Sequence, residues 1–254
     1  MSGDRSVDWD AATYDRVATP QEEWARGVLR RLPLGGDETV LDAGCGSGRV
    51  TRLLLERLPR GRVIGVDASP SMIEAARSGL PDERVVLICT DLLDLALDEP
   101  VDAAFSNATF HWVPDHERLF ARLAAAIAPG GRLVAQCGGA GNVEEFARAI
   151  LAGSAREPFA EHVGGTVPWN FAGPEETETR LAAAGFVDVR CWLEEKVAHP
   201  EDPRAFARAS GLAWHLDRLP TKLHEPFMDA VMEELDEDPT FAYVRLNIEA
   251  RRPG

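Results

Sequence analysis

The sequence predicts an α/β fold: a doubly wound, mostly parallel sheet of seven strands, with helices on both faces and a helical cap formed by insertions. Short runs rich in β-branched residues alternate with longer segments of helical periodicity, which is typical of βαβ units and of a parallel sheet. A glycine-rich turn at Gly44 to Gly48 follows the first of these runs, where a strand has to pass into its helix. The length of 254 residues suits one α/β domain with an elaboration.

Five strand and helix repeats fill the first half of the chain. The predicted strands span residues 39–44, 62–67, 84–89, 101–106 and 132–137. Ser69 and Pro70 provide an N-cap hydroxyl and a first-turn proline for the second helix, which runs to about residue 78. A helix over 115–127 is expected to stop at Pro129-Gly130-Gly131, which then turns the chain into the fifth strand.

The pattern changes after Gly141, where helices begin to dominate. Helical periodicity is found at about 142–156, 174–184, 203–217 and 222–235, and the last two strands are predicted at 186–194 and 241–250. We interpret these helices as a cap on the substrate side. The predicted organisation is a single domain comprising an N-terminal helical arm (1–34), a cofactor-binding core (35–138) and cap elements at 139–180 and 199–240.

The composition argues against several classes of partner. A net charge of −15 repels phosphate backbones and anionic membrane surfaces, because nucleic-acid binding relies on basic residues that displace counterions. No apolar run approaches the roughly 20 residues of a membrane-spanning helix, and no secretory signal is evident, so a cytoplasmic protein is expected. The four cysteines lie far apart without CxxC spacing, and neither a metal site nor a disulfide framework is predicted.

The glycine turn Leu41-Asp-Ala-Gly-Cys-Gly-Ser-Gly48 differs from the dinucleotide fingerprint. That fingerprint is GxGxxG, with a pyrophosphate resting on the helix N-terminus, whereas this spacing is GxGxG. Asp42 stands just ahead of the turn, where its carboxylate would repel a diphosphate but suit the ammonium group of an amino-acid-like ligand. A glycine turn alone can serve geometry only. With Asp42 beside it, the turn favours S-adenosylmethionine over NAD.

Two more acids follow the second and third predicted strands. Asp67 closes the second strand 19 residues after Gly48, where this architecture places an acid that accepts hydrogen bonds from ribose hydroxyls. Asp91 follows the third strand and is suited to the adenine amino group, with Leu92 and Met72 as an apolar surface for the ring. Each acid taken alone can be a solvated turn residue or a helix cap. Acids at the ends of three successive strands indicate a ligand site, because open α/β sheets bind ligands at that edge.

These residues, together with Ser106-Asn-Ala-Thr-Phe-His-Trp-Val-Pro-Asp-His116 and Pro129-Gly-Gly-Arg-Leu133, resemble class I S-adenosylmethionine-dependent methyltransferases, which have a Rossmann-like fold. Within that class the chain most resembles the trans-aconitate 2-methyltransferase group. The similarity includes the segment from Trp9 to Tyr14 and the closing stretch from Tyr243 to Arg252, so it spans nearly the whole chain. The region from Gly138 to Phe171 follows the group's pattern poorly, and we expect substrate selection there.

The resemblance implies roles for individual residues. Asp42, Gly44 and Gly46 would hold the methionine end of the cofactor, and Asn107 would lie near the sulfonium. Asp67 would bind the ribose, and Asp91 with Leu92 the adenine. Tyr14 is expected to fold over the cofactor as a lid, with a surface tyrosine as the alternative. The predicted cofactor contacts are therefore Asp42, Ala43, Gly44, Cys45, Gly46, Gly48, Asp67, Ala68, Met72, Asp91, Leu92, Asn107 and Tyr14.

Methyl transfer leaves the protein with orientation and desolvation as its tasks, because the cofactor carries the activated methyl group. A carboxylate nucleophile needs no base, whereas a hydroxyl, amine or carbon nucleophile can require one. His111 is the candidate base or substrate contact, because imidazole titrates near neutral pH. Trp112 and Trp169 are expected to wall the substrate pocket. Ordinary packing is the alternative for His111 and Trp112.

The acceptor is expected to be a small molecule, for which a carboxylic acid resembling trans-aconitate is one candidate. An anionic acceptor needs a local cation in so acidic a protein, and Arg204, Arg208, Arg218 and Arg245 are the candidates. A natural-product O-, N- or C-methyltransferase and a non-catalytic S-adenosylmethionine-binding module remain open. A nicotinamide dehydrogenase is opposed by the glycine spacing and by Asp42. The sequence leaves both a monomer and a homodimer possible.

Overall fold

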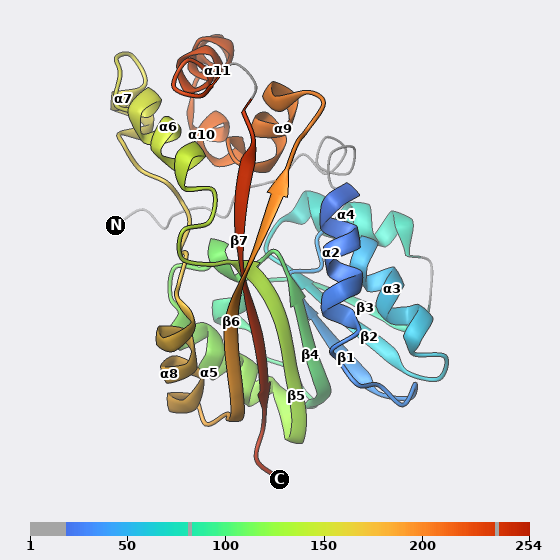
Figure 1. Cartoon of the computed structure of the whole chain (residues 1–254). Coiled ribbons are helices and arrows are strands. Elements are labelled where there is room, and N and C mark those ends of the chain that lie inside the picture. The colour runs from blue at the N-terminus through green and yellow to red at the C-terminus, as the bar shows by residue number, and fades with distance from the viewer. Residues whose placement is uncertain (1–18, 81–82, 237–238) are drawn as a thin grey trace.

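The computed structural model describes residues 19–80, 83–236 and 239–254 (Figure 1). Its centre is one sheet of seven strands in the order β3-β2-β1-β4-β5-β7-β6. The strands are β1 (Thr39–Ala43), β2 (Arg62–Asp67), β3 (Val85–Cys89), β4 (Val101–Asn107), β5 (Ile127–Gly138), β6 (Val187–Ala198) and β7 (Phe241–Arg251). β7 runs antiparallel to both of its neighbours, and the other pairs are parallel. The predicted fold class is confirmed.

The strand order reverses between β1 and β4, which run side by side although two strands separate them in the sequence. The loops after β1 and β4 therefore diverge to opposite faces of the sheet. Such a switch point opens a crevice at the carboxyl ends of the strands, where doubly wound sheets bind their ligands. The predicted glycine turn follows β1 and lies at this crevice.

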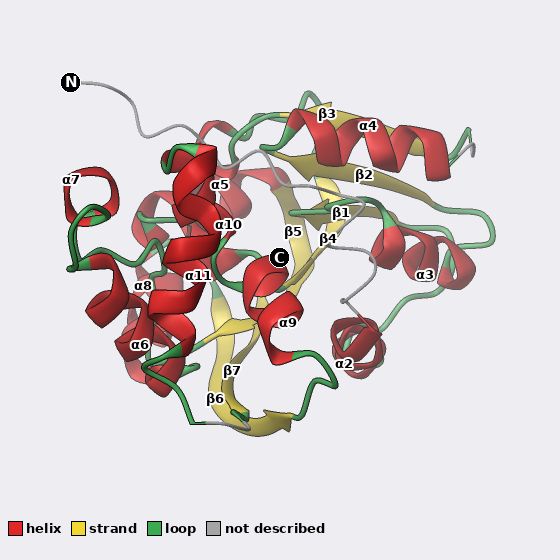
Figure 2. Ribbon diagram, turned by 90° about the horizontal axis from the view of Figure 1, so that it is seen from above, coloured by secondary structure: helices red, strands yellow, loops and turns green. Residues whose placement is uncertain are grey.

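Helices cover both faces of the sheet (Figure 2). α2 (Thr19–Leu29), α3 (Arg49–Arg57) and α4 (Pro70–Gly79) lie on one side, and α5 (His116–Ala126) and α8 (Pro174–Ala183) on the other. The N-cap predicted at Ser69 is confirmed, and α5 begins with a second side-chain cap at Asp115. Ser69 accepts a hydrogen bond from the Met72 amide at 3.3 Å, and Asp115 accepts one from the Arg118 amide at 2.9 Å.

Among the described residues, the buried hydrophobic side chains form three cores. Successive residues of a strand point to opposite faces, so Val40 packs with α2 and α3 while Leu41 packs with α5. The third core belongs to the cap above the sheet and includes Phe146, Phe227 and Phe241. This cap core is separate from the two cores that flank the sheet.

The cap consists of short helices carried above the upper ends of β6 and β7 (Figure 1). They are α6 (Glu144–Ser154), α7 (Ala160–Val163), α9 (Pro203–Ser210), α10 (Ala213–Arg218) and α11 (His224–Met232). The single helix predicted over 203–217 is wrong, because the chain breaks at Gly211. A Cβ atom there would approach Phe146 Cε1 to 2.3 Å, so close packing requires glycine. The helix predicted over 222–235 is shorter, since a 3₁₀ turn over Thr221–Leu223 precedes α11.

The predicted turn at Pro129-Gly130-Gly131 is also wrong. β5 begins at Ile127, directly after α5, and contains these residues as an irregularity where the pairing with β4 shifts register. Gly131 packs so closely that a Cβ atom would lie 2.6 Å from the Asp102 carbonyl oxygen. β6 extends to Ala198, four residues beyond its predicted end, because its upper part pairs with β7 under the cap.

Within the described ranges, none of the helices combines the length and the apolar character needed to cross a bilayer.

Candidate functional site

The glycine turn projects from the end of β1 into the crevice. Gly44, Gly46 and Gly48 all have positive φ, at 82°, 54° and 85°. The amides of Gly44 and Cys45 donate to the Val66 carbonyl at 2.8 and 3.0 Å, which fixes the turn against the end of β2. Backbone of this shape favours glycine, because L side chains rarely adopt positive φ.

The three glycines have different surroundings. A Cβ atom on Gly44 would lie 2.1 Å from Thr109 Oγ1, and one on Gly48 would lie 2.5 Å from Leu80 Cδ1. A Cβ atom on Gly46 would meet no heavy atom of the described residues within 4 Å. Gly44 and Gly48 are therefore required for internal packing, whereas Gly46 faces open space from which a ligand can approach the backbone.

Asp67 stands at the end of β2 beside this opening. Its carboxylate is half-buried and accepts hydrogen bonds from the amides of Gly46 and Ser69, each at 2.9 Å. Burial raises the pKa of Asp67 above its usual value, and the bonds from Ser69 and Gly46 oppose that rise. Because a carboxylate offers about four lone-pair positions, two remain for donors such as the hydroxyls of a ribose. Ala68, also half-buried, follows directly.

The residues predicted to bind adenine follow β3 and β2. Asp91 and Leu92 come after β3, and Met72 lies in α4, which follows β2. Asp91 is exposed and accepts a hydrogen bond from the Leu93 amide at 2.8 Å, so it caps the 3₁₀ turn Leu92–Asp94. Leu92 and Met72 are 5% and 4% exposed. Their side chains belong to the core beneath the crevice, and only a small part of each is accessible to a ring above them.

Asp42 lies beneath the glycine turn. It is 1% exposed, and its carboxylate accepts a hydrogen bond from Thr51 Oγ1 at 2.7 Å. Burial raises the pKa of Asp42 to about 7, and the charge of Asp67 adds to the rise while the Thr51 hydroxyl opposes it. Ala43 and Cys45 are buried beside it, and burial raises the pKa of the Cys45 thiol, which fits an inert turn residue. Because its side chain is buried beneath the turn, Asp42 would affect a cationic ligand through its negative charge and not through direct contact.

We expect the stability of the cofactor-free protein to depend on pH through Asp42. Its folded-state pKa is raised from 3.8 to about 7, so its favourable contribution is complete at pH values below about 4 and is lost as the pH rises through about 7. The free energy of unfolding of wild type relative to Asp42→Asn should fall by on the order of 4 kcal/mol between pH 4 and pH 8. Denaturant titrations across this range measure the difference. A constant difference would contradict the assignment.

Asn107 ends β4 and faces the same crevice. Its Oδ1 is buried and accepts no hydrogen bond from the described part of the chain. The next residue, Ala108, has φ of 58°, and its amide donates to the Gln136 carbonyl at 2.7 Å, so the loop after β4 is held in a strained shape. An orphaned acceptor at this position suits the positively charged part of S-adenosylmethionine. The open side of Gly46 and the free lone pairs of Asp67 fit the rest of that cofactor.

His111 lies in the 3₁₀ turn Phe110–Trp112, just beyond Asn107. It is 8% exposed, and its Nδ1 accepts a hydrogen bond from the Gly138 amide at 3.2 Å. Burial, together with the positive charge of Arg245, holds the pKa of His111 well below its usual value, so the ring is neutral. Since Nδ1 is an acceptor, the proton of the neutral ring is on Nε2.

An aromatic cluster forms around His111. The ring of His111 stacks on Phe171 with centroids 5.7 Å apart, Phe171 stacks on Trp169 at 5.4 Å, and Trp169 meets Trp112 edge-on at 5.9 Å. Asn170 holds the cap loop in place, because its amide donates to the His111 carbonyl at 2.8 Å. The structure therefore brings together the three residues that the sequence predicted for the acceptor side: His111, Trp112 and Trp169.

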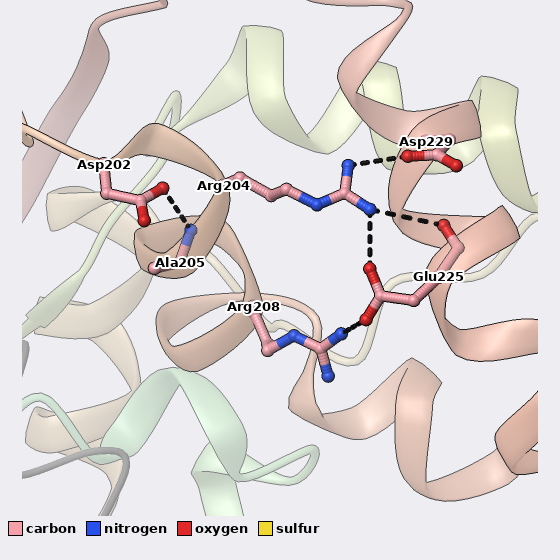
Figure 3. Close-up of polar contacts among 6 residues, drawn as sticks. All are labelled: Asp202, Arg204, Ala205, Arg208, Glu225 and Asp229. Carbon is pink, nitrogen blue, oxygen red and sulfur yellow. Dashed lines mark hydrogen bonds and ion pairs between the residues drawn. The ribbon is translucent and has the colours of Figure 1, made fainter.

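The four candidate arginines separate into two groups. Arg204 and Arg208 lie on α9 and pair with acids of α11: Arg204 binds Glu225 and Asp229 at 2.8 and 2.7 Å, and Arg208 also binds Glu225 (Figure 3). Arg218 lies over the Trp214 ring at 3.9 Å. Arg245, in contrast, is 3% exposed on β7 beside the acceptor side of the crevice. The sequence alone did not separate it from the other three.

Tyr14 lies outside the described residues, so its predicted role as a lid stays a prediction. No group of three or more potential metal ligands occurs among the residues for which the structure gives positions.

Comparison with known proteins gives a consistent picture. Residues 40–131 match the family described as a methyltransferase domain. The trans-aconitate 2-methyltransferase of Variovorax paradoxus is 34% identical over 245 residues, which cover 91% of this chain and 90% of that protein. The trans-aconitate 2-methyltransferase of Methylobacterium nodulans is 33% identical, with coverage of 97% and 99%.

Solved structures show the same fold at low identity. The YcgJ protein of Bacillus subtilis superposes with a TM-score of 0.66 at 15% identity, over 91% of this chain and 99% of that chain. Haemonchus contortus phosphoethanolamine N-methyltransferase 2, in complex with S-adenosyl-L-methionine, gives a TM-score of 0.63 at 20% identity, over 96% and 57%.

Proposed function

Since the chain belongs to the trans-aconitate 2-methyltransferase group of class I S-adenosylmethionine-dependent methyltransferases, we propose that it methylates a carboxylate oxygen of a small organic acid. Its cofactor is S-adenosyl-L-methionine, which leaves as S-adenosyl-L-homocysteine. A small-molecule acceptor is consistent with the acidic charge of the chain, which disfavours nucleic acid. A cytoplasmic location and a monomeric or homodimeric state remain part of this proposal.

The tautomer of His111 supports a carboxylate acceptor. A general base needs a free lone pair, and the lone pair of this ring is on Nδ1, which already accepts from the Gly138 amide. Protonation at Nδ1 would break that bond and place a charge in a buried position, where burial already lowers the pKa of His111. His111 is therefore suited to donate a hydrogen bond from Nε2. A carboxylate acceptor is already ionised, so it needs no general base in addition to this hydrogen bond.

The reaction balances without a base. The carboxylate oxygen donates an electron pair to the methyl carbon, the bond from that carbon to sulfur breaks, and its electrons remain on sulfur as a neutral thioether. The products are a methyl ester and S-adenosyl-L-homocysteine, and no proton is transferred. The protein holds the acid in line with the methyl group, and such positioning supplies roughly 7 to 11 kcal/mol of barrier lowering in well-oriented systems.

An acceptor screen tests this function. Purified protein and S-adenosyl-L-methionine are incubated with trans-aconitate, related di- and tricarboxylic acids, phenols and primary amines, and the products are identified by mass spectrometry. We expect base-labile methyl esters of the acids. Methylation of phenols or amines with no ester formed would overturn the proposal in favour of a natural-product O- or N-methyltransferase. Cofactor binding without turnover of any acceptor would favour a non-catalytic module.

Two substitutions distinguish a hydrogen-bond donor from a base at His111. Glutamine can accept from the Gly138 amide and still donate from its terminal nitrogen, so His111→Gln should keep kcat within about tenfold of wild type, while His111→Ala should lose more. Loss of a general base typically lowers rates by about 10²- to 10⁴-fold, and glutamine cannot replace one. Equal losses of that size in both variants, measured by single-turnover kinetics, would show that His111 takes a proton.

A further inference from the structure

A pocket of about 600 Å³ lies on the face of the sheet that α2 covers, between this helix and the strands β5, β7 and β6. Its floor follows from the strand register. Gln136, Asn247 and Trp192 lie abreast on the three strands, and residues in register point to the same face of a sheet. None of the described residues assigned to the cofactor or the acceptor lines this pocket. Its volume is within the range of small-molecule sites, about 300 to 1,000 Å³.

Positive charge dominates the lining of this pocket. The charged side chains that line it are those of Arg26, Arg30, Arg31, Lys196 and Glu194. Glu194 is the acid among them, and it is already bound by Lys196 at 2.8 Å, with Asn247 donating to it at 3.5 Å. In a chain of net charge −15, cations gathered around one cavity are a marked exception to the composition. Such a gathering attracts small anions.

Two arginines in the turn after α2 keep hydrogen-bonding capacity. Arg30 forms no ion pair with an acid of the described ranges, and its Nη2 lies 3.7 Å from the position of a Cβ atom on Gly27, which lines the pocket. Arg31 Nε lies 3.7 Å from Glu249 Oε1, and neither Nε nor Nη2 donates a hydrogen bond to the described part of the chain. Burial lowers the pKa of Arg31, while the charge of Glu249 opposes this effect. Both guanidiniums therefore have donors left for an anion.

Two indole rings position the cations around the pocket. Lys196 Nζ lies 5.6 Å from the centre of the Trp24 ring, and Arg31 Cζ lies 4.8 Å from that of Trp192. Arg190 Cζ lies 4.6 Å from the centre of the Trp192 ring as well. A cation–π contact orients a cation without neutralising it, because the ring carries no net charge. The rings also provide apolar walls against which the carbon part of a ligand can pack.

We propose that this pocket binds a phosphate group, either as free inorganic phosphate or as the phosphate of a small ester. A phosphate monoester carries a charge of about −1.5 to −2 at pH 7 and three strong acceptor oxygens, whereas a carboxylate offers one charge and two oxygens. The forked guanidiniums of Arg30 and Arg31 match phosphate geometry, and Lys196 adds a point charge. The ligand is a third small molecule besides the cofactor and the acceptor, so this site is independent of the proposed function.

Calorimetric titration of the full-length protein tests the proposal, with S-adenosyl-L-homocysteine at saturation, constant ionic strength and a buffer free of phosphate. The probes are inorganic phosphate, phenyl phosphate and benzoate, which joins the same ring to a carboxylate. We expect phenyl phosphate to bind at least about tenfold more tightly than benzoate. Arg30→Gln and Arg31→Gln should each weaken phenyl phosphate binding at least about tenfold, because each removes hydrogen bonds to a charged group.

Arg77→Gln is the matched control for these variants. Arg77 lies on α4, pairs with Glu74 at 3.1 Å and does not line the pocket, so its variant should bind phenyl phosphate as wild type does. The two phosphate probes distinguish the sources of the phosphate group. Tighter binding of phenyl phosphate indicates an organic phosphate whose carbon part packs on the indole rings, and equal binding indicates free phosphate.

The proposal would be overturned if wild type bound neither phosphate probe at millimolar concentration, if benzoate bound as tightly as phenyl phosphate, or if Arg30→Gln and Arg31→Gln left phosphate binding unchanged. A lower unfolding temperature in Arg31→Gln, with no phosphate bound by wild type, would assign the arginines to the negative end of the α2 dipole instead. Arg30 is exposed, so Arg30→Gln still decides if Arg31→Gln fails to fold. Affinity for S-adenosyl-L-homocysteine should equal that of wild type in both variants, and a parallel loss would show a structural role and overturn the site.

Discussion

Replacing Gly46 with valine should lower the affinity for S-adenosyl-L-homocysteine by at least about 100-fold, while the protein remains folded. The Cβ atom at this position meets nothing within 4 Å among the described residues, so the substitution creates no clash with them. Its branched side chain occupies the space through which a ligand approaches the backbone. The positive φ of 54° also strains the variant by about 1 to 3 kcal/mol, which a domain of ordinary stability tolerates. Calorimetric titration and thermal unfolding measure the two effects.

Gly130 offers a matched control for this experiment. It has φ of 81°, and a Cβ atom there also meets no atom of the described part of the chain within 4 Å, but it lies at the start of β5, at the end of the sheet away from the crevice. Gly130→Val should lose a comparable amount of stability and keep its cofactor affinity. Similar affinities in both valine variants would remove the glycine turn from the cofactor site. Gly44→Ala should instead unfold more easily, because its Cβ would collide with Thr109.

Removal of the Asp67 carboxylate should produce the second large effect, a loss of about 10²- to 10⁴-fold in cofactor affinity. Hydrogen bonds to a charged group contribute about 1.5 to 3 kcal/mol each, and a ribose presents two hydroxyls to this carboxylate. Asp67→Ala also frees the Gly46 and Ser69 amides that the carboxylate now binds, so the turn loses part of its support. Calorimetry with S-adenosyl-L-homocysteine is the measurement.

Two further variants serve as controls for that result. Asp67→Asn keeps one acceptor oxygen for the turn but loses the charge, so its affinity should lie between those of wild type and Asp67→Ala. Glu74→Ala removes an exposed acid of α4 that pairs with Arg77, and it should leave the affinity unchanged. Wild-type affinity in Asp67→Ala would show that the ribose is bound elsewhere.

Most of the sheet could be predicted because local sequence patterns indicate where its strands and helices lie. β-branched runs and the Ser69 N-cap act over a few residues, and the structure confirms both of them. The errors arise where distant packing decides the local structure. The break at Gly211 depends on Phe146, and the course of Pro129 to Gly131 depends on contacts with the neighbouring strand. Neither contact can be predicted from the residues that surround the break at Gly211 or the segment from Pro129 to Gly131.

The candidate site shows the same division. The positions of Gly46, Asp67 and Asn107 follow from the rule that strand ends converge at one edge, and the structure places them there. The tautomer of His111 could not be predicted, because it is set by an amide 27 residues away in β5. Arg245 was named only as one of four arginines, since its place beside the crevice depends on the register of β5 with β7. The pairing register of two strands that lie far apart in the chain cannot be predicted from a single sequence.

The three separate hydrophobic cores affect how acceptor preference can diverge in evolution. Residues of the candidate acceptor pocket, such as Trp169 and Phe171, pack against the cap core, whereas the glycine turn rests on the cores beside the sheet. Mutations can therefore accumulate in the cap without passing through variants that bind the cofactor poorly. We propose that 139–180 and 199–240 form the freely varying part of this enzyme, and that descendants with new acceptors would retain Gly46 and Asp67.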